Sequence, residues 1–419
     1  MSSRFIKWLR GTYNKIVTSI AFYPAIIAIG FLVLSWLMLE LDFSETGKHI
    51  KSYYSWIRLK DASTARSIVS TIAGGIISLM VFSFSMVMIL LNQAASQMSN
   101  RMLESMIGNR FQQLVLGTYI GTIVYSLFLL STIRDIESGI YVPALSIYLL
   151  VALTVVDIFL FIYFLHYVTQ SVKFETIIER VHRQTLASLQ KSCTVDIPEN
   201  TILPATEAVV LLTQRSGSFQ GFDQRSLLKF IGENSGTVQL IHPAGTYLLV
   251  GQPILKWYGK ALSDDCKVEL LLTLDFYSGQ PITQNAYYGF HQLAEVALKA
   301  LSPGINDPET AVLSLHALAD LFAYRSRHHP QLCIQHPDDK GSIILTDRTF
   351  EDLFAVCIYP IWDYGKNDRY IQQGLYSILT QLLKIAPADS HKELLAGMLE
   401  KVDQKVTETS GQLPLVKSI

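Results

Sequence analysis

One carboxylate stands inside a long apolar stretch of this chain, where a charged group could bind or carry an ion. Asp157 lies near the middle of the stretch 141–168. A carboxylate inside a bilayer costs a few kcal/mol, so it normally faces a partner or water. We expect that partner to be Tyr125 or Ser126. Two interpretations stay open, an ion or proton path and a neutral, hydrogen-bonded structural aspartic acid.

The turn LSPGINDPETA, which begins at Leu301, is the second pattern that could bind a ligand. Gly304 can adopt a positive φ and end the preceding helix, and Asp307 with the proline after it fits an N-cap and first helical position. These roles are structural. The alternative is a small-anion or metal site, in which the helix N-terminus offers N–H groups and Asn306, Asp307 and Glu309 offer oxygens.

Catalytic motifs are absent from the sequence. It contains no P-loop, HExxH or dinucleotide-binding fingerprint, and GSFQG places Ser218 outside the spacing of a nucleophile elbow. His328, His329 and His336 lie near Cys333 in a polar linker, without the regular spacing of a zinc site. We therefore expect no catalytic residue, no resident metal, no cofactor and no enzymatic activity.

Composition points to a membrane protein. Of 419 residues, 50% are apolar and only 16% are charged, against roughly 25% charged in an average soluble domain. Residues 1–190 carry 15 Lys and Arg against 10 Asp and Glu, or +5, and residues 191–419 carry 19 against 25, or −6. The acidic half has no basic stripe with interleaved aromatics, which argues against nucleic acid as a partner.

Four apolar segments are each long enough to cross a bilayer, which takes roughly 20 helical residues. None has the polar face of a helix that lies in water. The sequence therefore predicts a four-helix transmembrane domain over 1–170, with the lipid bilayer as its surroundings. The predicted helices lie at about 21–41, 67–91, 111–133 and 141–168.

Lys and Arg near the segment ends predict the orientation of the chain in the membrane. Ten such residues flank one side and six flank the other. The difference favours a multi-pass protein of the bacterial inner membrane with both termini in the cytoplasm. Tyr53, Tyr54 and Trp56 in the first outer loop suggest a segment that lies at the membrane interface.

Small residues mark helix faces that allow close packing in lipid. We expect them to join the second and third helices within one subunit. The alternative is contact between subunits, or a polar pore lining that includes Ser83 and Ser85. The small residues are Ser70, Gly74 and Ser78 in the second segment and Gly117 and Gly121 in the third.

The rest of the chain predicts a soluble α+β domain. A stalk helix is expected over 171–192, a β-rich module with a small β-barrel-like part over 193–275, and a mainly helical module over 276–419. Val268–Leu274 is one of the expected strands. The expected helices of the last module are about 285–300, 308–325, 369–385 and 390–406.

Two blocks of sequence resemble the signatures of a bacterial family of predicted four-helix inner-membrane proteins of unknown function. The blocks are LNQAASQMSNRMLESMIGNRFQQLVLGTYIGTIVYSLFLLSTIR at 91–134 and YYGFHQLAEVALKALSPGINDPETA at 287–311. The resemblance spans nearly the whole chain. It implies four membrane helices with a soluble C-terminal region and brings no activity, cofactor or catalytic residue with it.

Three functions fit these observations. The first is a homo-oligomeric channel or pore with a cytosolic regulatory domain, which would handle a small ion or ligand. The second is a membrane-anchored sensor or scaffold whose cytosolic domain binds a ligand or a partner. The third is an enzyme whose site lies around Asn306–Glu309. We favour the channel.

Overall fold

The fold is described from a computed structural model. The residues that it describes are 21–54, 61–97, 110–133, 142–196, 204, 207–277 and 279–410, with the side chains of 93–97 and 409–410 left aside. The chain forms two compact units, Met1–Lys173 and Phe174–Ile419. We name them the membrane unit and the C-terminal unit.

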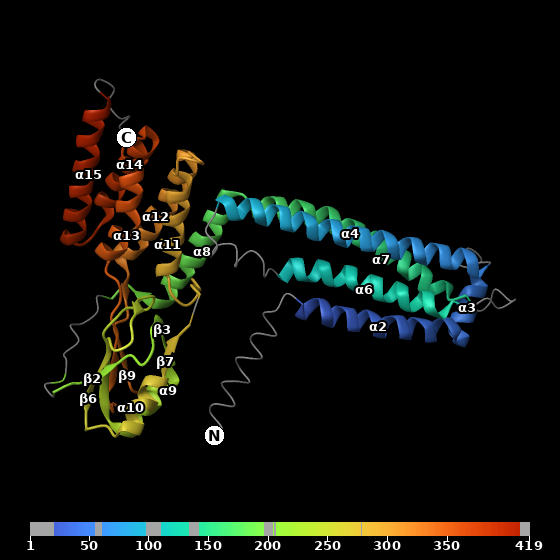
Figure 1. Cartoon of the computed structure of the whole chain (residues 1–419), viewed down its shortest axis with the longest axis horizontal. Coiled ribbons are helices and arrows are strands. Elements are labelled where there is room, and N and C mark those ends of the chain that lie inside the picture. Colours follow the sequence, from blue (N-terminus) through green and yellow to red (C-terminus); the bar gives the residue numbers. More distant parts are fainter. Residues whose placement is uncertain are drawn as a thin grey trace. The chain divides into compact units, whose positions relative to one another are not determined.

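Four long helices and one short helix build the described part of the membrane unit. The four predicted spans are confirmed, and each helix is long and apolar enough to cross a bilayer. Helix α6 packs against the other three long helices (Figure 1). The helices are α2 (Phe22–Phe43), α3 (Glu45–Tyr53), α4 (Ala62–Gln97), α6 (Arg110–Thr132) and α7 (Ala144–Ser171).

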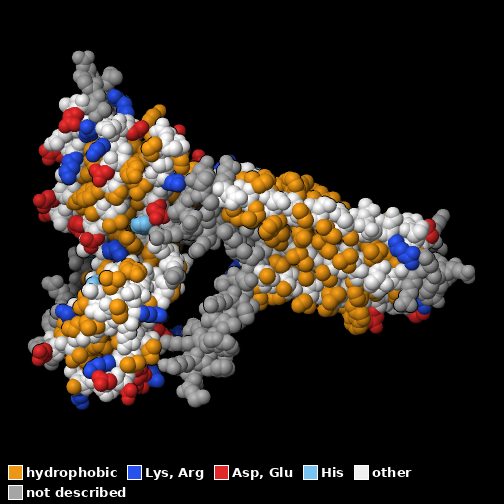
Figure 2. Space-filling model, in the orientation of Figure 1, with side chains coloured by type: hydrophobic (Ala, Val, Ile, Leu, Met, Phe, Trp, Pro, Cys, Tyr) orange, Lys and Arg blue, Asp and Glu red, His pale blue; other side chains and the backbone are white. Residues whose placement is uncertain are grey.

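The two units differ in the polarity of their surfaces. The membrane unit has the apolar surface expected of a protein in a bilayer, and the C-terminal unit has the mixed surface expected in water. Figure 2 shows apolar side chains along most of the visible face of the membrane unit. On the visible face of the C-terminal unit, acidic and basic side chains are scattered between apolar ones. Tyr53 and Tyr54 at the end of α3 are exposed, whereas Trp56 lies outside the described residues.

The small residues of α6 do not pack against α4, so that prediction is wrong. A Cβ on Gly117 would lie 2.6 Å from Cδ1 of Ile27, and one on Gly121 would lie 2.7 Å from the ring of Phe31, both in α2. A Cβ on Gly74 of α4 would meet no atom within 4 Å. The glycines of α6 therefore allow the close approach of α2, while Ser70, Gly74 and Ser78 of α4 are exposed.

A buried carboxylate joins the helix ends at the α3 end of the membrane unit. Asp42 accepts hydrogen bonds from the backbone N–H groups of Leu145 (3.1 Å) and Ser146 (2.7 Å) in the first turn of α7. A carboxylate at a helix N-terminus satisfies free N–H groups and the helix dipole. Its Oδ1 also lies 3.2 Å from Nζ of Lys51 in α3. Asp42 thus connects α2, α3 and α7.

The described part of the C-terminal unit holds eight helices and ten short strands. The helices are α8 (Phe174–Ser192), α9 (Gln224–Asn234), α10 (Asp264–Leu272), α11 (Tyr287–Ala300), α12 (Pro308–Arg327), α13 (Phe350–Gly365), α14 (Arg369–Ile385) and α15 (Asp389–Ser410). The strands are β1 (Cys193–Thr194), β2 (Val209–Leu212), β3 (Gly217–Phe222), β4 (Gly236–Leu240), β5 (Tyr247–Leu248), β6 (Pro253–Gly259), β7 (Leu274–Phe276), β8 (His329–Pro330), β9 (Cys333–Gln335) and β10 (Ser342–Ile344).

The strands form three small sheets, and the described residues contain no closed barrel. The largest sheet has the order β2-β6-β4-β10-β9, and the others are β5-β3-β7 and β1-β8. Strand β10 pairs in parallel with β4, with Ile343 opposite Val238. The expected division into a β-rich and a helical module at 275/276 is therefore not kept, because three strands from beyond residue 276 join these sheets.

Helix α8 is part of the core of the C-terminal unit and not a free stalk. Its apolar face packs against α11 and α12, where Ile178, Val181 and Leu189 are buried. Figure 1 shows α11 to α15 gathered at one end of this unit and most strands at the other. The helical spacing of apolar residues predicted the helix correctly, but its partner is the rest of the C-terminal unit.

The strand expected at Val268–Leu274 is wrong, because most of that segment belongs to α10. The hydroxyl of Ser263 accepts a hydrogen bond from the N–H of Cys266 and caps the helix. Asp264 and Asp265 occupy the first turn, where acidic side chains favour the helix dipole. The helix cap and the acidic first turn therefore outweigh the preference of the apolar residues for a strand.

We predict that Asp42→Ala destabilises the membrane unit by about 3–5 kcal/mol, the usual cost of removing one partner from a buried ion pair. The thermal unfolding of the full chain in detergent measures this. Glu45→Ala is the matched control, because Glu45 pairs with Lys48 at the surface, where a pair contributes about 1 kcal/mol or less. Equal unfolding temperatures for both variants would contradict the role of Asp42.

We predict that Gly289→Ala destabilises the C-terminal unit by about 1–3 kcal/mol. The new methyl group would overlap the side chain of Thr185 and force α11 away from α8. Gly397→Ala in α15 meets no atom within 4 Å, so it should stabilise its helix by about 1 kcal/mol. Thermal unfolding of the two variants checks the opposite signs, and a loss of similar size in both would refute this packing.

Candidate functional site

A cluster of polar groups lies inside the membrane unit at the level of Asp157. The Asp157 carboxylate on α7 is fully buried and has the Thr122 hydroxyl of α6 as its hydrogen-bonding neighbour. The Ser83 hydroxyl of α4 is a hydrogen-bonding neighbour of the Tyr119 phenol on α6. The Tyr119 phenol also interacts electrostatically with Asp157. We call these four residues the Asp157 cluster. Three helices contribute to it.

None of these four polar groups has a hydrogen bond of ordinary geometry within the described structure. Other hydroxyls on the same helices do, because they turn back to a backbone carbonyl four residues earlier. Ser78 and Ser85 of α4 do so at 2.9 Å, and Thr118 of α6 does so at 2.9 Å. The hydroxyls of Ser83 and Thr122 make no such bond.

The residues expected to partner Asp157 lie elsewhere. The Tyr125 hydroxyl donates to the carbonyl of Ser146 (3.1 Å), and the Ser126 hydroxyl donates to that of Ile123 (2.8 Å). Asp157 is 13 residues beyond the start of α7, and the antiparallel α6 reaches that level at Tyr119, 13 residues before its end. Tyr125 is about 9 Å farther along the helix axis.

Ser83 and Ser85 cannot line one pore, so that part of the prediction is also wrong. Two residues apart on a helix means a rotation of about 200°. Ser83 is buried in the bundle, whereas Ser85 is exposed on the opposite side of α4.

Small and hydroxyl side chains form a row along the outward side of α4, which the exposed Val81 interrupts between Ser78 and Ser85. We call this row the α4 outer stripe. Its members are exposed in the single chain and cover about five turns of the helix. They are Ser67, Ser70, Thr71, Gly74, Ser78 and Ser85.

The turn at 301–311 is held by its own hydrogen bonds. The Asp307 carboxylate accepts from the N–H (3.1 Å) and the hydroxyl (2.6 Å) of Thr310 and caps α12, as predicted. The positive φ falls on Asn306 (φ 50°) and not on Gly304. Glu309 is exposed. The sequence placed the left-handed residue wrongly because Gly and Asn both tolerate that conformation.

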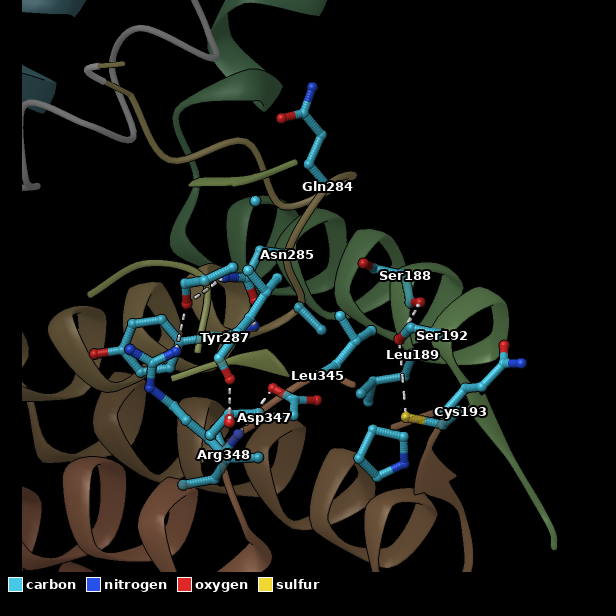
Figure 3. Close-up of a pocket in the computed structure, with 18 of the residues that line it drawn as sticks. Ser188, Leu189, Ser192, Cys193, Gln284, Asn285, Tyr287, Leu345, Asp347 and Arg348 are labelled. Carbon is cyan, nitrogen blue, oxygen red and sulfur yellow. Dashed lines mark hydrogen bonds between the residues drawn. The ribbon is translucent and has the colours of Figure 1, made fainter. Parts of the chain in front are cut away.

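A cavity of about 220 Å³ opens within the C-terminal unit (Figure 3). Its wall includes side chains from α8, β1, β3, the start of α11 and the segment after β10. Figure 3 shows Asn285, Tyr287 and Arg348 on one side of it, and Ser188 and Cys193 on another. Such a volume is below the usual range for drug-sized ligands and suits a small molecule.

Two arginines give the cavity a positive wall. The Arg348 guanidinium lies 3.6 Å from the ring centroid of Tyr287 and donates through Nη1 to the carbonyl of Ala244 (2.6 Å). The buried Arg325 donates to the backbone carbonyl of Arg348 (3.1 Å) and holds that segment in place. Asp347 contributes one carboxylate to the wall. The arrangement can bind a small anion that also has an apolar part.

Cys193 lines the cavity but is not set up as a nucleophile. Burial raises the pKa of its thiol, and the nearby Ser192 hydroxyl and Arg325 oppose that effect only in part. Nucleophilic cysteines need a lowered pKa. The cavity therefore has the features of a binding site. Sequence reasoning missed it, because its residues come from segments spread between 188 and 353.

Comparisons with known proteins agree with a membrane location. The family described as "Predicted membrane protein (DUF2254)" matches residues 17–381. An uncharacterized protein of Mycobacterium tuberculosis (strain CDC 1551 / Oshkosh) is 29% identical over 331 residues, and one of Mycobacterium bovis is 28% identical over 331 residues. Each match covers 75% of this chain but 63% of the relative, so the chain spans under two thirds of these relatives. No solved structure matches the chain.

We predict that iodoacetamide modifies Cys193 several-fold more slowly than Cys266 or Cys333 in the folded chain. The reagent attacks the thiolate, and a raised pKa together with burial keeps the Cys193 thiolate scarce at neutral pH. Peptide mass spectrometry after timed labelling gives the rates, and the Cys193 rate should rise with pH. The three rates should become similar in denaturant. Fast labelling of native Cys193 would contradict this site description.

Proposed function

The chain belongs to the DUF2254 family of predicted membrane proteins, the family that its two sequence blocks resemble, and we propose that it forms a homo-oligomeric channel whose C-terminal unit regulates it. The observation that carries the proposal is the α4 outer stripe. A channel made of several copies needs a helix face that allows close approach and offers hydroxyl groups to water. The stripe has both properties.

Between Ser67 and Ser78 the exposed face of α4 carries mostly small and hydroxyl side chains and so differs from the exposed faces of two other membrane helices. From Val81 onward α4 also exposes large apolar side chains, such as Phe82 and Ile89. α7 presents large apolar side chains such as Val155, Phe159 and Ile162, and α2 presents Ile29 and Trp36. Large apolar side chains are suited to contact with lipid tails. Small residues instead favour helix–helix contact, because they allow backbones to approach closely. The stripe therefore supports α4 as the helix that meets neighbouring copies.

In the proposed channel, α4 helices from several copies surround a common axis. Hydroxyls of Ser67, Ser70 and Thr71 would face water along that axis, and Gly74 and Ser78 would set the distance between neighbouring helices. The Ser78 hydroxyl donates a hydrogen bond to the carbonyl of Gly74, so it needs no partner on a neighbouring helix. The lining is polar without charge, which suits passage of a small solute or ion.

The cavity of the C-terminal unit supports the regulatory part of the proposal. A small anion bound between Arg348 and the α8 wall would contact both the β10–α13 segment and the helix that follows the last membrane span. A ligand shifts a conformational equilibrium only when it binds one state more tightly than the other. Closure of this wall around the anion would supply such a difference.

The sidedness of the channel follows from the charge bias. Four crossings return the chain to the side on which it started, and the larger number of Lys and Arg residues flanks that side. We therefore propose a protein of the bacterial inner membrane with both termini and the C-terminal unit in the cytoplasm.

A second candidate is a membrane-anchored sensor, and the cavity is the observation that favours it. In that case the anion would bind in the C-terminal unit while the membrane helices only anchor the protein. Solute flux separates the two candidates, because an anchor does not conduct.

We predict that the purified chain forms a defined oligomer and releases trapped ions from liposomes. Gly74→Leu combined with Ser78→Leu should reduce both the oligomer and the flux on the order of tenfold, since helix contacts in lipid contribute about 1–2 kcal/mol each. Native mass spectrometry and a fluorescent ion-flux assay measure the two quantities.

The matched control is Val155→Leu combined with Val156→Leu, which also enlarges exposed side chains but on α7. This variant should assemble and conduct as the unmodified chain does. A chain that stays monomeric and non-conducting under voltage would refute the channel and leave the sensor.

A further inference from the structure

The Asp157 cluster has more oxygen atoms than the protein uses. Both carboxylate oxygens of Asp157, the hydroxyls of Ser83 and Thr122 and the phenol of Tyr119 are buried, and all five atoms lack a hydrogen bond of ordinary geometry in the described structure. Unsatisfied buried polar atoms are costly, most of all at membrane depth, where no bulk water can compensate. So many at one level of one bundle need a common explanation.

Chance orientation does not explain the two helix hydroxyls. The hydroxyl of a serine or threonine in a membrane helix can donate a hydrogen bond to a backbone carbonyl of the preceding turn. Ser85 and Thr118 do this on the same two helices that carry Ser83 and Thr122. Nothing in the helix backbone prevents the same bond at the two cluster positions. Ser83 and Thr122 instead have the Tyr119 phenol and the Asp157 carboxylate as neighbours, so oxygens from three helices gather at one level.

We propose that the Asp157 cluster is a binding site for one alkali-metal cation within each subunit. Asp157 supplies the charge, and Ser83, Thr122 and Tyr119 supply neutral oxygens from two other helices. An ion at this point accepts a lone pair from each oxygen and satisfies all of them at once.

The chemistry of the oxygens selects the class of ion. The set contains oxygens only, which suits hard cations and not the transition metals that prefer nitrogen or sulfur ligands. One carboxylate neutralises one positive charge. A divalent cation would leave an uncompensated buried charge, which is strongly disfavoured in an apolar interior.

The site is independent of the proposed channel. It lies on the buried side of α4, opposite the α4 outer stripe, so an ion there joins α4, α6 and α7 of one subunit and does not occupy the channel axis. Its expected effect is to stabilise the bundle. A monomeric or non-conducting chain would still bind the ion, and a conducting oligomer could lack it.

Equilibrium binding of radioactive sodium and rubidium to the purified full chain in detergent tests the site. We expect about one ion per chain, and a higher unfolding temperature in sodium or potassium chloride than in choline chloride at equal ionic strength. Asp157→Asn should abolish both effects. Ser83→Ala and Thr122→Val should each weaken binding by at least roughly tenfold.

Ser85→Ala and Thr118→Val are the matched controls, because each removes a hydroxyl that donates to a backbone carbonyl of its own helix, α4 or α6. Both should bind as the unmodified chain does. Unfolding in choline chloride shows whether each variant folds, and Thr122→Ser, which keeps the hydroxyl, should retain binding if Thr122→Val misfolds. The proposal is overturned if the unmodified chain binds neither ion, or if folded Asp157→Asn binds them equally well.

Discussion

Everything in the membrane unit depends on one constraint, which is that a polar group in lipid must find its partner inside the protein. The chain meets this constraint in different ways at two carboxylates. Asp42 is buried but fully engaged, with the N-terminus of α7 and with Lys51. Asp157 is equally buried, but its neighbours Thr122 and Tyr119, both on α6, make no hydrogen bond of ordinary geometry with it in the described structure. The first carboxylate joins the ends of three helices, and the second is the one at which we propose that a cation binds.

The same constraint distinguishes the faces of the helices. α2 and α7 expose large apolar side chains, while α4 exposes mostly small residues between Ser67 and Ser78 and large apolar ones from Val81 onward. The other side of α4 packs against α6 and α7. The C-terminal unit obeys a different rule, since water satisfies its surface. There a polar cavity can stay open, with Arg348 held by Tyr287 and Ala244. The small outward residues of α4 and this cavity are the two features behind our proposal of a regulated channel.

The four spans were predictable because apolar length alone determines them, and so was the Asp307 cap, which depends on local sequence. What failed depends on tertiary structure. The level at which α6 meets α7 decides that Tyr119 and not Tyr125 approaches Asp157. Asp42 was missed because its partners on α7 lie about a hundred residues away in the sequence. The cavity could not be foreseen for the same reason, because segments spread between residues 188 and 353 build its wall.

The central claim is that copies of this chain meet along α4, and disulfide formation at Ser78→Cys in liposomes tests it most directly. Ser78 lies in the middle of the small outward face, and Val156 on α7 is similarly exposed to lipid. With the four native cysteines replaced by alanine, mild oxidation should link Ser78→Cys copies into covalent dimers and leave Val156→Cys copies unlinked. Equal linking at both positions, or none at Ser78→Cys, would contradict the account.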